Sequence, residues 1–436
     1  MRFQSRPRSC SRPEPRALAR LRVLAPLGAL ALAAFLAGCA GRPDGFLLPV
    51  EAPAEGASRV DVLVATTRAS LGAAPGEMFS GERAYGLAFA DVAVSIPPDA
   101  ARTAGDVQWP ASAKADPAHE FAALSVRRLE GGQAAGVFHE RLRRTRHRSV
   151  LVFVHGYNTR FDEAVFRLAQ IAHDAKAPAV PVLFTWPSRG RLLAYAYDRE
   201  SANFSRDALE SVLRSFADDP ATAEITILAH SMGNWVTLEA LRQMSIRNGR
   251  ISPKIRSVML AAPDVDIDVF RRQIEAIGEK RPPFMLFVSQ DDKALALSRR
   301  LWGSTARLGA IDPDQEPLRS QLQSARVQVI DLTNQSSSDS LNHGKFAGSP
   351  DVARLIGGKL ASGQTLSSSH VGLGESLGLV ATGAAGAMGR AASIAVTAPA
   401  AIVDRRAREG LADQVEDLRG HVQDTVSHAV TPPGRR

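Results

Sequence analysis

Cysteine is almost absent from this 436-residue chain, which contains only Cys10 and Cys39. From residue 40 onward the sequence therefore has no disulfide within it, no thiol nucleophile and no thiolate ligand for a metal ion. Apolar runs long enough to cross a membrane several times are absent too. These absences exclude a disulfide-stapled scaffold, a cysteine-dependent enzyme and a polytopic membrane protein.

Acidic residues are scarce at the N-terminus. The whole chain has 53 Lys and Arg against 45 Asp and Glu, a net charge of +8. Residues 1–38 hold seven arginines, no lysine and one acid, Glu14, so this segment carries six of those eight charges. The rest of the chain therefore has a net charge of only +2, and the basic balance gives no indication of a nucleic-acid partner.

Residues 1–38 have the pattern of an export signal. Their arginines precede an apolar run, VLAPLGALALAAFLAG, that is short for a membrane span and is followed by Cys39. Leu36-Ala-Gly-Cys39 resembles the lipobox of bacterial lipoproteins, which implies cleavage before Cys39 and attachment of a diacylglycerol to its thiol. We therefore predict a lipid-anchored protein of the cell envelope with its folded part in the periplasm, and Ala40 favours the outer membrane by the same resemblance. An ordinary signal peptide that ends near a cysteine is the alternative.

Composition and periodicity divide the remaining sequence into four parts. Residues 39–58, rich in Gly, Pro and Ala, are predicted to form a flexible tether. Residues 59–145 are predicted to be a β-rich segment that leads into the main domain. Residues 146–360 alternate apolar strands with helical periods, which predicts a mostly parallel α/β sheet with helices on both faces. Residues 361–436 are predicted to be an Ala/Gly-rich and amphipathic helical tail, packed back on the domain or loosely ordered rather than lying on a membrane.

The individual elements follow from the same patterns. Short Val/Ile/Leu runs predict strands, and apolar positions at helical spacing predict helices. The predicted strands are 60–65, 90–96, 121–126, 149–154, 180–185, 224–229, 255–262, 284–289 and 327–332, and the predicted helices of the main domain are 161–175, 200–216, 233–246, 294–302 and 350–360.

One strand runs directly into a serine turn. The apolar run from Ile225 leads into Ala229-His-Ser231-Met-Gly233, and a helical period follows. A serine on a tight strand-to-helix turn stands clear of the sheet beside the free N–H groups of a helix N-terminus, and small residues two positions before and after it allow the close approach of strand and helix. Ala229 replaces the glycine usual at the first of these positions. Ser231 is the predicted nucleophile.

A serine nucleophile needs a histidine base and an acid that orients the histidine. In this architecture both follow the serine in the chain, the acid first and the histidine after it. Of the histidines after Ser231, only His343 lies in a loop between a predicted strand and the last predicted core helix, and it is the predicted base. Asp292, after the strand 284–289, is the predicted acid, and its neighbour Asp291 is expected to point elsewhere. Asp264 remains a competitor, although we expect residues 264–268 to be loop and helix-capping positions.

Backbone N–H groups must also stabilise the negative oxygen that develops during acyl transfer. The strand 149–154 ends in His155-Gly156-Tyr157, and the amides of Tyr157 and Met232 are the predicted oxyanion hole. His155 precedes the serine and is expected to brace the loop rather than act as the base. Trp186, after the next strand, is expected to be a packing residue rather than a pocket wall.

Several segments together resemble one bacterial family of α/β hydrolases of unknown function, which is grouped with esterase- and lipase-like enzymes. The segments that carry the resemblance are 151–158 (LVFVHGYN), 184–188 (FTWPS), 229–234 (AHSMGN), 261–266 (AAPDVD), 289–295, 342–343, 64–68 (VATTR), 83–86 (RAYG) and 94–97 (VSIP). The resemblance implies an α/β-hydrolase fold with a Ser–Asp–His site, and it brings no substrate with it.

These observations predict a serine hydrolase that cleaves an acyl ester and is tethered to the envelope by Cys39. No cofactor and no metal is required, the predicted partners are an ester substrate and the membrane, and the oligomeric state is left open. The alternative is a hydrolase-fold lipoprotein without catalysis that binds or scaffolds at the envelope. Esterase, lipase and peptidase activities are not distinguished at this level.

Overall fold

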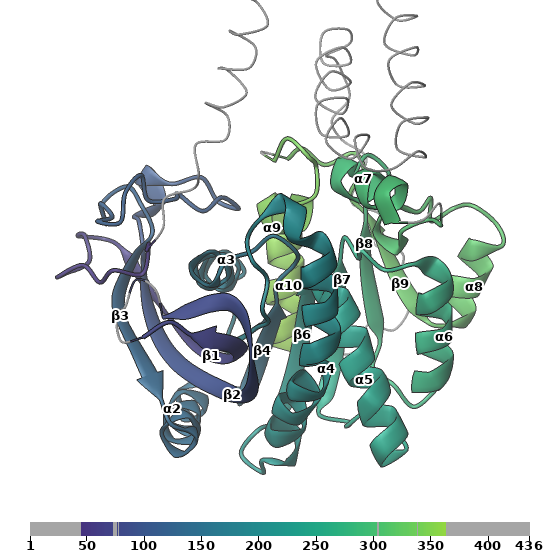
Figure 1. Cartoon of the computed structure of the whole chain (residues 1–436), viewed down its shortest axis with the longest axis horizontal. Coiled ribbons are helices and arrows are strands. Elements are labelled where there is room, and N and C mark those ends of the chain that lie inside the picture. The colour runs from purple at the N-terminus through teal and green to yellow at the C-terminus, as the bar shows by residue number, and fades with distance from the viewer. Residues whose placement is uncertain (1–44, 73–75, 77, 303–304, 338, 363–436) are drawn as a thin grey trace, which may run out of the picture.

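The computed structural model describes residues 45–72, 76, 78–302, 305–337 and 339–362 (Figure 1). Its centre is a nine-stranded sheet with the order β3-β2-β1-β5-β4-β6-β7-β8-β9. β1 and β2 pair antiparallel, as do β2 and β3, and every other neighbouring pair is parallel. The strands are β1 (Ser58–Ser70), β2 (Phe79–Ile96), β3 (Ala122–Leu129), β4 (Ser149–Val154), β5 (Val180–Thr185), β6 (Glu224–His230), β7 (Ile255–Ala261), β8 (Phe284–Val288) and β9 (Val327–Asp331).

Helices cover both faces of this sheet. Alternate residues of β4 point to opposite sides, so that Val152 belongs to one apolar core and Leu151 to the other. The first core includes side chains of α2 (Gly131–Arg144), α4 (Tyr195–Asp218), α5 (Gly233–Asn248), α6 (Ile267–Ile277) and α8 (Leu318–Ser324), and the second includes α3 (Phe161–Asp174), α9 (Lys345–Gly348) and α10 (Pro350–Ser362). α7 (Lys293–Trp302) follows β8. The predicted α/β fold is confirmed.

The strand order brings the loop after β4 and the loop after β6 to neighbouring positions at the carboxyl edge of the sheet. β4 lies between β5 and β6, because the chain passes from β4 to β5 on one side and then crosses to β6 on the other. The loops after β4 and β6 therefore diverge at the carboxyl edge of the sheet, and such a divergence opens a crevice at which α/β proteins bind ligands. The predicted nucleophile and the predicted oxyanion loop both lie at this edge.

Four of the described helices were not anticipated from the sequence: α2, α6 and the short α8 and α9. α2 lies in the segment predicted to be β-rich; its buried face is narrow, consisting of Ala134, Phe138 and Leu142, and its glycines weaken the helical signal. α6 begins after Asp266, whose carboxylate accepts hydrogen bonds from the amides of Asp268 and Val269. The acidic run at 264–268 therefore caps a helix, as expected.

The predicted tether differs from the structure at residues 46–50. We predicted flexibility over residues 39–58, but Phe46 and Leu47 are buried and the ring of Phe46 lies 6.5 Å from that of Phe166. The amide of Val50 also donates a hydrogen bond to Ala123 O at 2.8 Å. The apolar side chains of this Gly/Pro-rich stretch pack on the domain. The free energy gained by burying them is larger than the cost of ordering a stretch that locally prefers to be flexible.

Some predictions fall outside the described residues. These are the signal peptide at 1–38, the lipidated Cys39 and the tail beyond residue 362. Among the residues that the structure describes, no helix combines the length and the apolar character needed to cross a membrane.

Two adjacent glycines of α10 should respond oppositely to substitution by alanine. A Cβ on Gly357 would lie 2.0 Å from Ala175 O, whereas a Cβ on Gly358 would meet nothing within 4 Å. We expect Gly357→Ala to lower the free energy of unfolding by about 1–3 kcal/mol through overpacking. We expect Gly358→Ala to raise it by about 0.5–1 kcal/mol through helix propensity. Urea denaturation of the two variants measures this, and equal effects would contradict the packing of α10 on the end of α3.

Candidate active site

Ser231 occupies a strained position between β6 and α5. Its φ is 53°, in the left-handed region that residues other than glycine rarely adopt. The amide of Ser231 donates to Ala261 O at 2.9 Å, and Asn234 Nδ2 donates to Ser231 O at 2.9 Å. These hydrogen bonds hold the turn in its strained form, a situation that is typical of functional sites.

Small residues around the turn are required by close contacts between loops. A Cβ on Gly233 would lie 2.4 Å from His155 O, and a Cβ on Gly156 would lie 2.8 Å from the Cβ of Ser231. Neither position admits a larger residue without movement of the backbone. Ala229, where glycine is usual, is fully buried in the first apolar core, so its methyl group is accommodated.

His343 is hydrogen-bonded to Asp292. The distance from His343 Nδ1 to Asp292 Oδ2 is 2.7 Å, and the amide of Leu295 donates to Asp292 Oδ1 at 2.9 Å. Because a carboxylate only accepts, Nδ1 carries a proton and Nε2 is the acceptor of the neutral ring. Burial alone would lower the pKa of His343, but the charge and hydrogen bond of Asp292, with the charges of Asp264 and Asp339, together outweigh it and raise that pKa. The pair has the geometry of a base and its orienting acid.

His230 connects the histidine loop to the serine turn. Its ring lies 4.7 Å from the ring of His343, and its Nε2 is 3.3 Å from His343 O. Burial lowers the pKa of His230 well below its usual value, so the ring is neutral and donates through Nε2. Since His230 directly precedes Ser231, this contact joins the His343 loop to the end of β6, next to the serine turn.

Two further carboxylates hold the loop that carries His343. The carboxylate of Asp339 accepts hydrogen bonds from the amides of His343 at 2.8 Å and Gly344 at 3.0 Å. Asp291 points away from His343, as expected, and binds the buried ammonium of Lys345 at 2.7 Å. Asp339 and Lys345 were not singled out from the sequence, although an aspartate four residues before a loop histidine is a local turn signal.

Asp264 is engaged elsewhere. Its Oδ2 accepts the Tyr195 hydroxyl at 2.8 Å, and its Oδ1 accepts the Ser298 hydroxyl at 2.7 Å. Arg307 Nε lies 3.4 Å from Oδ1. The carboxylate hydrogen-bonded to His343 is therefore that of Asp292 and not that of Asp264.

Two backbone amides near Ser231 are available to an oxyanion. Within the described part of the chain, neither the Tyr157 amide nor the Met232 amide donates a hydrogen bond to another group. Met232 follows Ser231 directly, and Tyr157 follows Gly156, which is in contact with the Ser231 side chain. Unengaged N–H groups on the residue after Ser231 and on the residue after Gly156 are donors of the kind that an oxyanion hole requires.

A buried arginine that was not singled out from the sequence supports the loop after β4, which carries the predicted oxyanion donor Tyr157. The guanidinium of Arg68 donates to the carbonyls of Thr159 and Ser188 and to the Thr185 hydroxyl, each at 2.8 Å. Burial lowers the pKa of Arg68 to about 10, which leaves it charged at neutral pH. Arg68 is the last residue of the segment VATTR, one of the segments that resemble the hydrolase family. The resemblance therefore included this arginine but did not indicate what it does.

His155 and Trp186 form the packed base of this loop. Burial, reinforced by the charge of Arg68, lowers the pKa of His155 to about 3, so the ring is neutral. Its Nε2 lies 2.8 Å from the Thr185 hydroxyl and its ring stacks on Trp186 at 5.0 Å. Trp186 is fully buried. Both residues brace and pack the loop, as expected from the sequence.

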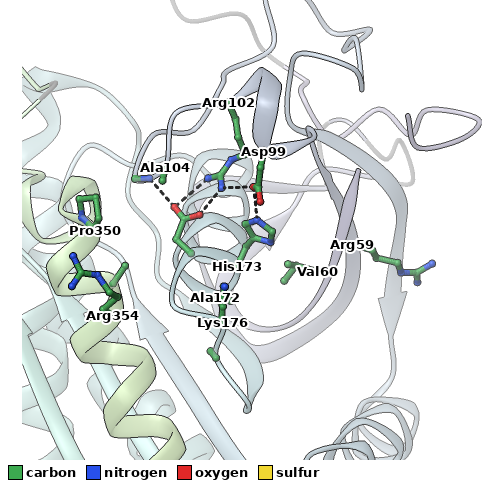
Figure 2. Close-up of a pocket in the computed structure, with 14 residues that line it drawn as sticks. Arg59, Val60, Asp99, Arg102, Ala104, Ala172, His173, Lys176, Pro350 and Arg354 are labelled. Atoms are coloured by element: carbon green, nitrogen blue, oxygen red, sulfur yellow. Dashed lines mark hydrogen bonds and ion pairs between the residues drawn. The ribbon is translucent and has the colours of Figure 1, made fainter. Parts of the chain in front are cut away.

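One pocket of the structure lies away from Ser231 and His343. Its volume is about 570 Å³, and it lies between the end of α3 and the first turns of α10 (Figure 2). Arg102 and Asp174 form its buried ion pair at 2.6 Å, and neither Ser231 nor His343 lines it. In the described segments, no cluster of three or more His, Cys, Asp or Glu side chains is arranged to hold a metal ion.

A mostly parallel sheet covered on both faces, with a serine on the turn after a central strand, is the architecture of the α/β hydrolases. The family model of alpha/beta hydrolases of unknown function (DUF900) matches residues 132–359, and the chain belongs to this family.

Comparison with solved structures finds distant likenesses. The product of gene lin2722 from Listeria innocua is 8% identical with a TM-score of 0.31, covering 50% of this chain and 95% of that one. A lipase-esterase related protein from Clostridium acetobutylicum ATCC 824 is 13% identical with a TM-score of 0.16, covering 48% and 67%. At these TM-scores neither likeness bears on function. A comparison with curated proteins finds no significant match.

Proposed function

We propose that the protein is a serine hydrolase that cleaves an acyl ester. The observation that supports this is the hydrogen bond between His343 and Asp292, together with the ring of His343 lying 4.7 Å from that of His230, the residue directly before the strained Ser231. Nucleophile, base, acid and oxyanion donors are the parts that acyl transfer through a serine requires.

The reaction runs in two halves. Ser231 Oγ attacks the ester carbonyl carbon while His343 Nε2 takes the hydroxyl proton, and the amides of Tyr157 and Met232 bind the carbonyl oxygen as it becomes negative. The tetrahedral intermediate then collapses, the C–O bond to the alcohol breaks, and the protonated His343 gives its proton to the departing alcohol. Water repeats the sequence on the acyl-enzyme, which releases the acid and restores Ser231. Asp292 orients His343 and stabilises its charged form throughout.

We propose further that this reaction takes place at the cell envelope. The support is the N-terminal pattern of a basic segment, an apolar run and Leu36-Ala-Gly-Cys39. Growth with a radiolabelled fatty acid tests it, because a lipid-anchored form incorporates the label and a Cys39→Ala variant does not.

Labelling with a fluorophosphonate probe tests the activated serine. The full chain is expected to form one covalent adduct, located at Ser231 by mass spectrometry, because only a serine activated by a base reacts rapidly with such probes. Ser231→Ala should abolish the adduct. Ser245→Ala should keep it, since Ser245 is a buried serine of α5 that donates to Ile277 O and lies in no part of the site. A folded protein that stays unlabelled would favour a non-catalytic binding protein.

A further inference from the structure

A small polar pocket adjoins the proposed oxyanion hole. It is lined by Tyr195, Arg199, Met232, Trp235, Asp264 and Arg307. Met232 directly follows Ser231, and the amide of Asp264 donates to Ser231 O at 3.3 Å. The pocket has a volume of about 10 Å³, enough for one water-sized group and too little for an acyl chain. A substrate bound to Ser231 therefore lies next to these polar side chains, because Met232, which lines the pocket, directly follows Ser231.

Arg307 brings unused hydrogen-bond donors to this pocket. Its side chain is 8% exposed, and its Nε is buried without a hydrogen-bond partner. Among the residues that the structure describes, none of the guanidinium N–H groups of Arg307 donates a hydrogen bond, and its ionic contact with Asp264 at 3.4 Å is not one. Buried donors are rarely left unsatisfied, and a guanidinium is best satisfied by a carboxylate or phosphate.

The acceptor capacity of the pocket, in contrast, is already used. Asp264 is its only carboxylate, and both of its oxygen atoms accept hydroxyl hydrogen bonds, from Ser298 and from Tyr195. A cationic ligand would find no free carboxylate oxygen here. The unsatisfied groups of the pocket are donors, so the complementary ligand is an acceptor.

A second cation adds to the positive charge. Arg199 is half-buried, and its guanidinium lies 5.3 Å from the centre of the Trp235 ring. In the part of the chain that the structure describes, Arg199 makes no ion pair. Arg199 and Arg307 therefore face a single carboxylate, Asp264, which leaves the pocket with a net positive charge.

We propose that this pocket binds an anionic group of the substrate, a carboxylate or a phosphate, and that Arg307 with Arg199 makes the enzyme specific for esters that carry this group near the scissile bond. The proposal rests on the proposed function, and it names the substrate class of the same site. One anionic oxygen fills the water-sized space and accepts from Arg307. The bound anion would lie between the guanidinium groups of Arg307 and Arg199, so its negative charge would also reduce the repulsion between them.

Matched ester pairs test the specificity. For the acyl side, mono-p-nitrophenyl adipate is compared with p-nitrophenyl hexanoate, which has the same chain length without the carboxylate. For the alcohol side, 4-acetoxybenzoate is compared with its methyl ester. In one of the pairs the full-length wild-type protein is expected to show at least about tenfold higher kcat/KM for the charged ester, the size of one charge-assisted hydrogen bond.

Variants assign that preference to the pocket. Arg307→Gln should lower kcat/KM for the charged ester at least about tenfold more than kcat/KM for the neutral ester, which removes the preference, whereas Arg307→Lys should retain part of it. Arg272→Gln, an exposed arginine on α6, is the control that should change neither value. Arg199→Gln should also lower the preference for the charged ester. This variant tests the proposal if Arg307→Gln, which changes a buried residue, does not fold.

The outcomes separate the two proposals. Fluorophosphonate labelling of Ser231 with equal kcat/KM in both pairs overturns the anionic specificity and leaves the hydrolase. Equal loss on charged and neutral esters in Arg307→Gln also overturns it, because the arginine would then be structural. No labelling and no hydrolysis overturns the proposed function and this inference together.

Discussion

Ser231→Ala is expected to lower kcat for p-nitrophenyl acetate by about 10⁴-fold or more, because the variant keeps the oxyanion donors but has no group to attack the carbonyl. The residual rate should be that of binding and oxyanion stabilisation alone. Initial rates with both proteins at equal concentration give the ratio. The Cβ of Ser231 is retained, so the contact with Gly156 and the fold should persist, which circular dichroism verifies.

Ser245→Ala is the matched control for this experiment. It removes a buried serine hydroxyl from α5 and should lower the free energy of unfolding by about 1 kcal/mol without changing kcat. If Ser231→Ala hydrolysed the ester as fast as the wild type, the nucleophile would be another group and the proposed mechanism would be wrong.

Asp292→Asn is expected to reduce kcat by about 10³–10⁴-fold, since an amide in place of the carboxylate favours the wrong tautomer of His343 and cannot stabilise its charge. The side chain is almost the same size and fully buried, so the fold should tolerate it. Asp264→Asn is the matched control, because Asp264 binds Tyr195 and Ser298 rather than His343. It should cost neutral esters at most about tenfold. A larger loss from Asp264→Asn than from Asp292→Asn would reverse the assignment of the acid.

The pH dependence supplies a second readout of the same variant. His343 must be neutral to accept a proton, and against the effect of burial its pKa is raised above the ordinary 6.5 by Asp292 first and by the charges of Asp264 and Asp339. In the wild type, kcat/KM should therefore fall on the acid side with a midpoint above pH 6.5. In Asp292→Asn the largest of the raising contributions is lost and only those of Asp264 and Asp339 still oppose burial, so the pKa of His343 should fall and the residual activity should persist to lower pH. An unchanged midpoint would mean that Asp292 does not act through His343.

Several elements could be read from the sequence because their signal is local. β4 and β5 were predicted to the residue, since a short uninterrupted apolar run between turn residues is the pattern of a strand buried on both faces. α2 was missed because only three of its side chains are buried and its glycines obscure the period. The packing of Phe46 and Leu47 was missed because their partners lie far away in the chain.

The candidate site divides in the same way. Ser231 was identified from the residues around it, and His343 from its place in the chain order, so both depended on patterns along the sequence. The sequence favoured Asp292 as the acid but left Asp264 as a competitor, because both follow neighbouring strands and are the same residue type. Only the folded chain shows that Asp264 is taken up by Tyr195 and Ser298, while Asp292 reaches His343.

The sequence by itself determined the fold class, the serine turn and the identity of the candidate base, because periodicity, turn chemistry and small residues act over a few neighbouring positions. The tertiary structure alone decided which acid meets His343, that Arg68 braces the oxyanion loop and that Arg307 brings unused donors to a pocket beside Met232. These contacts join residues tens of positions apart. Whether a buried charge is satisfied depends on what lies around it in space, which no local pattern encodes.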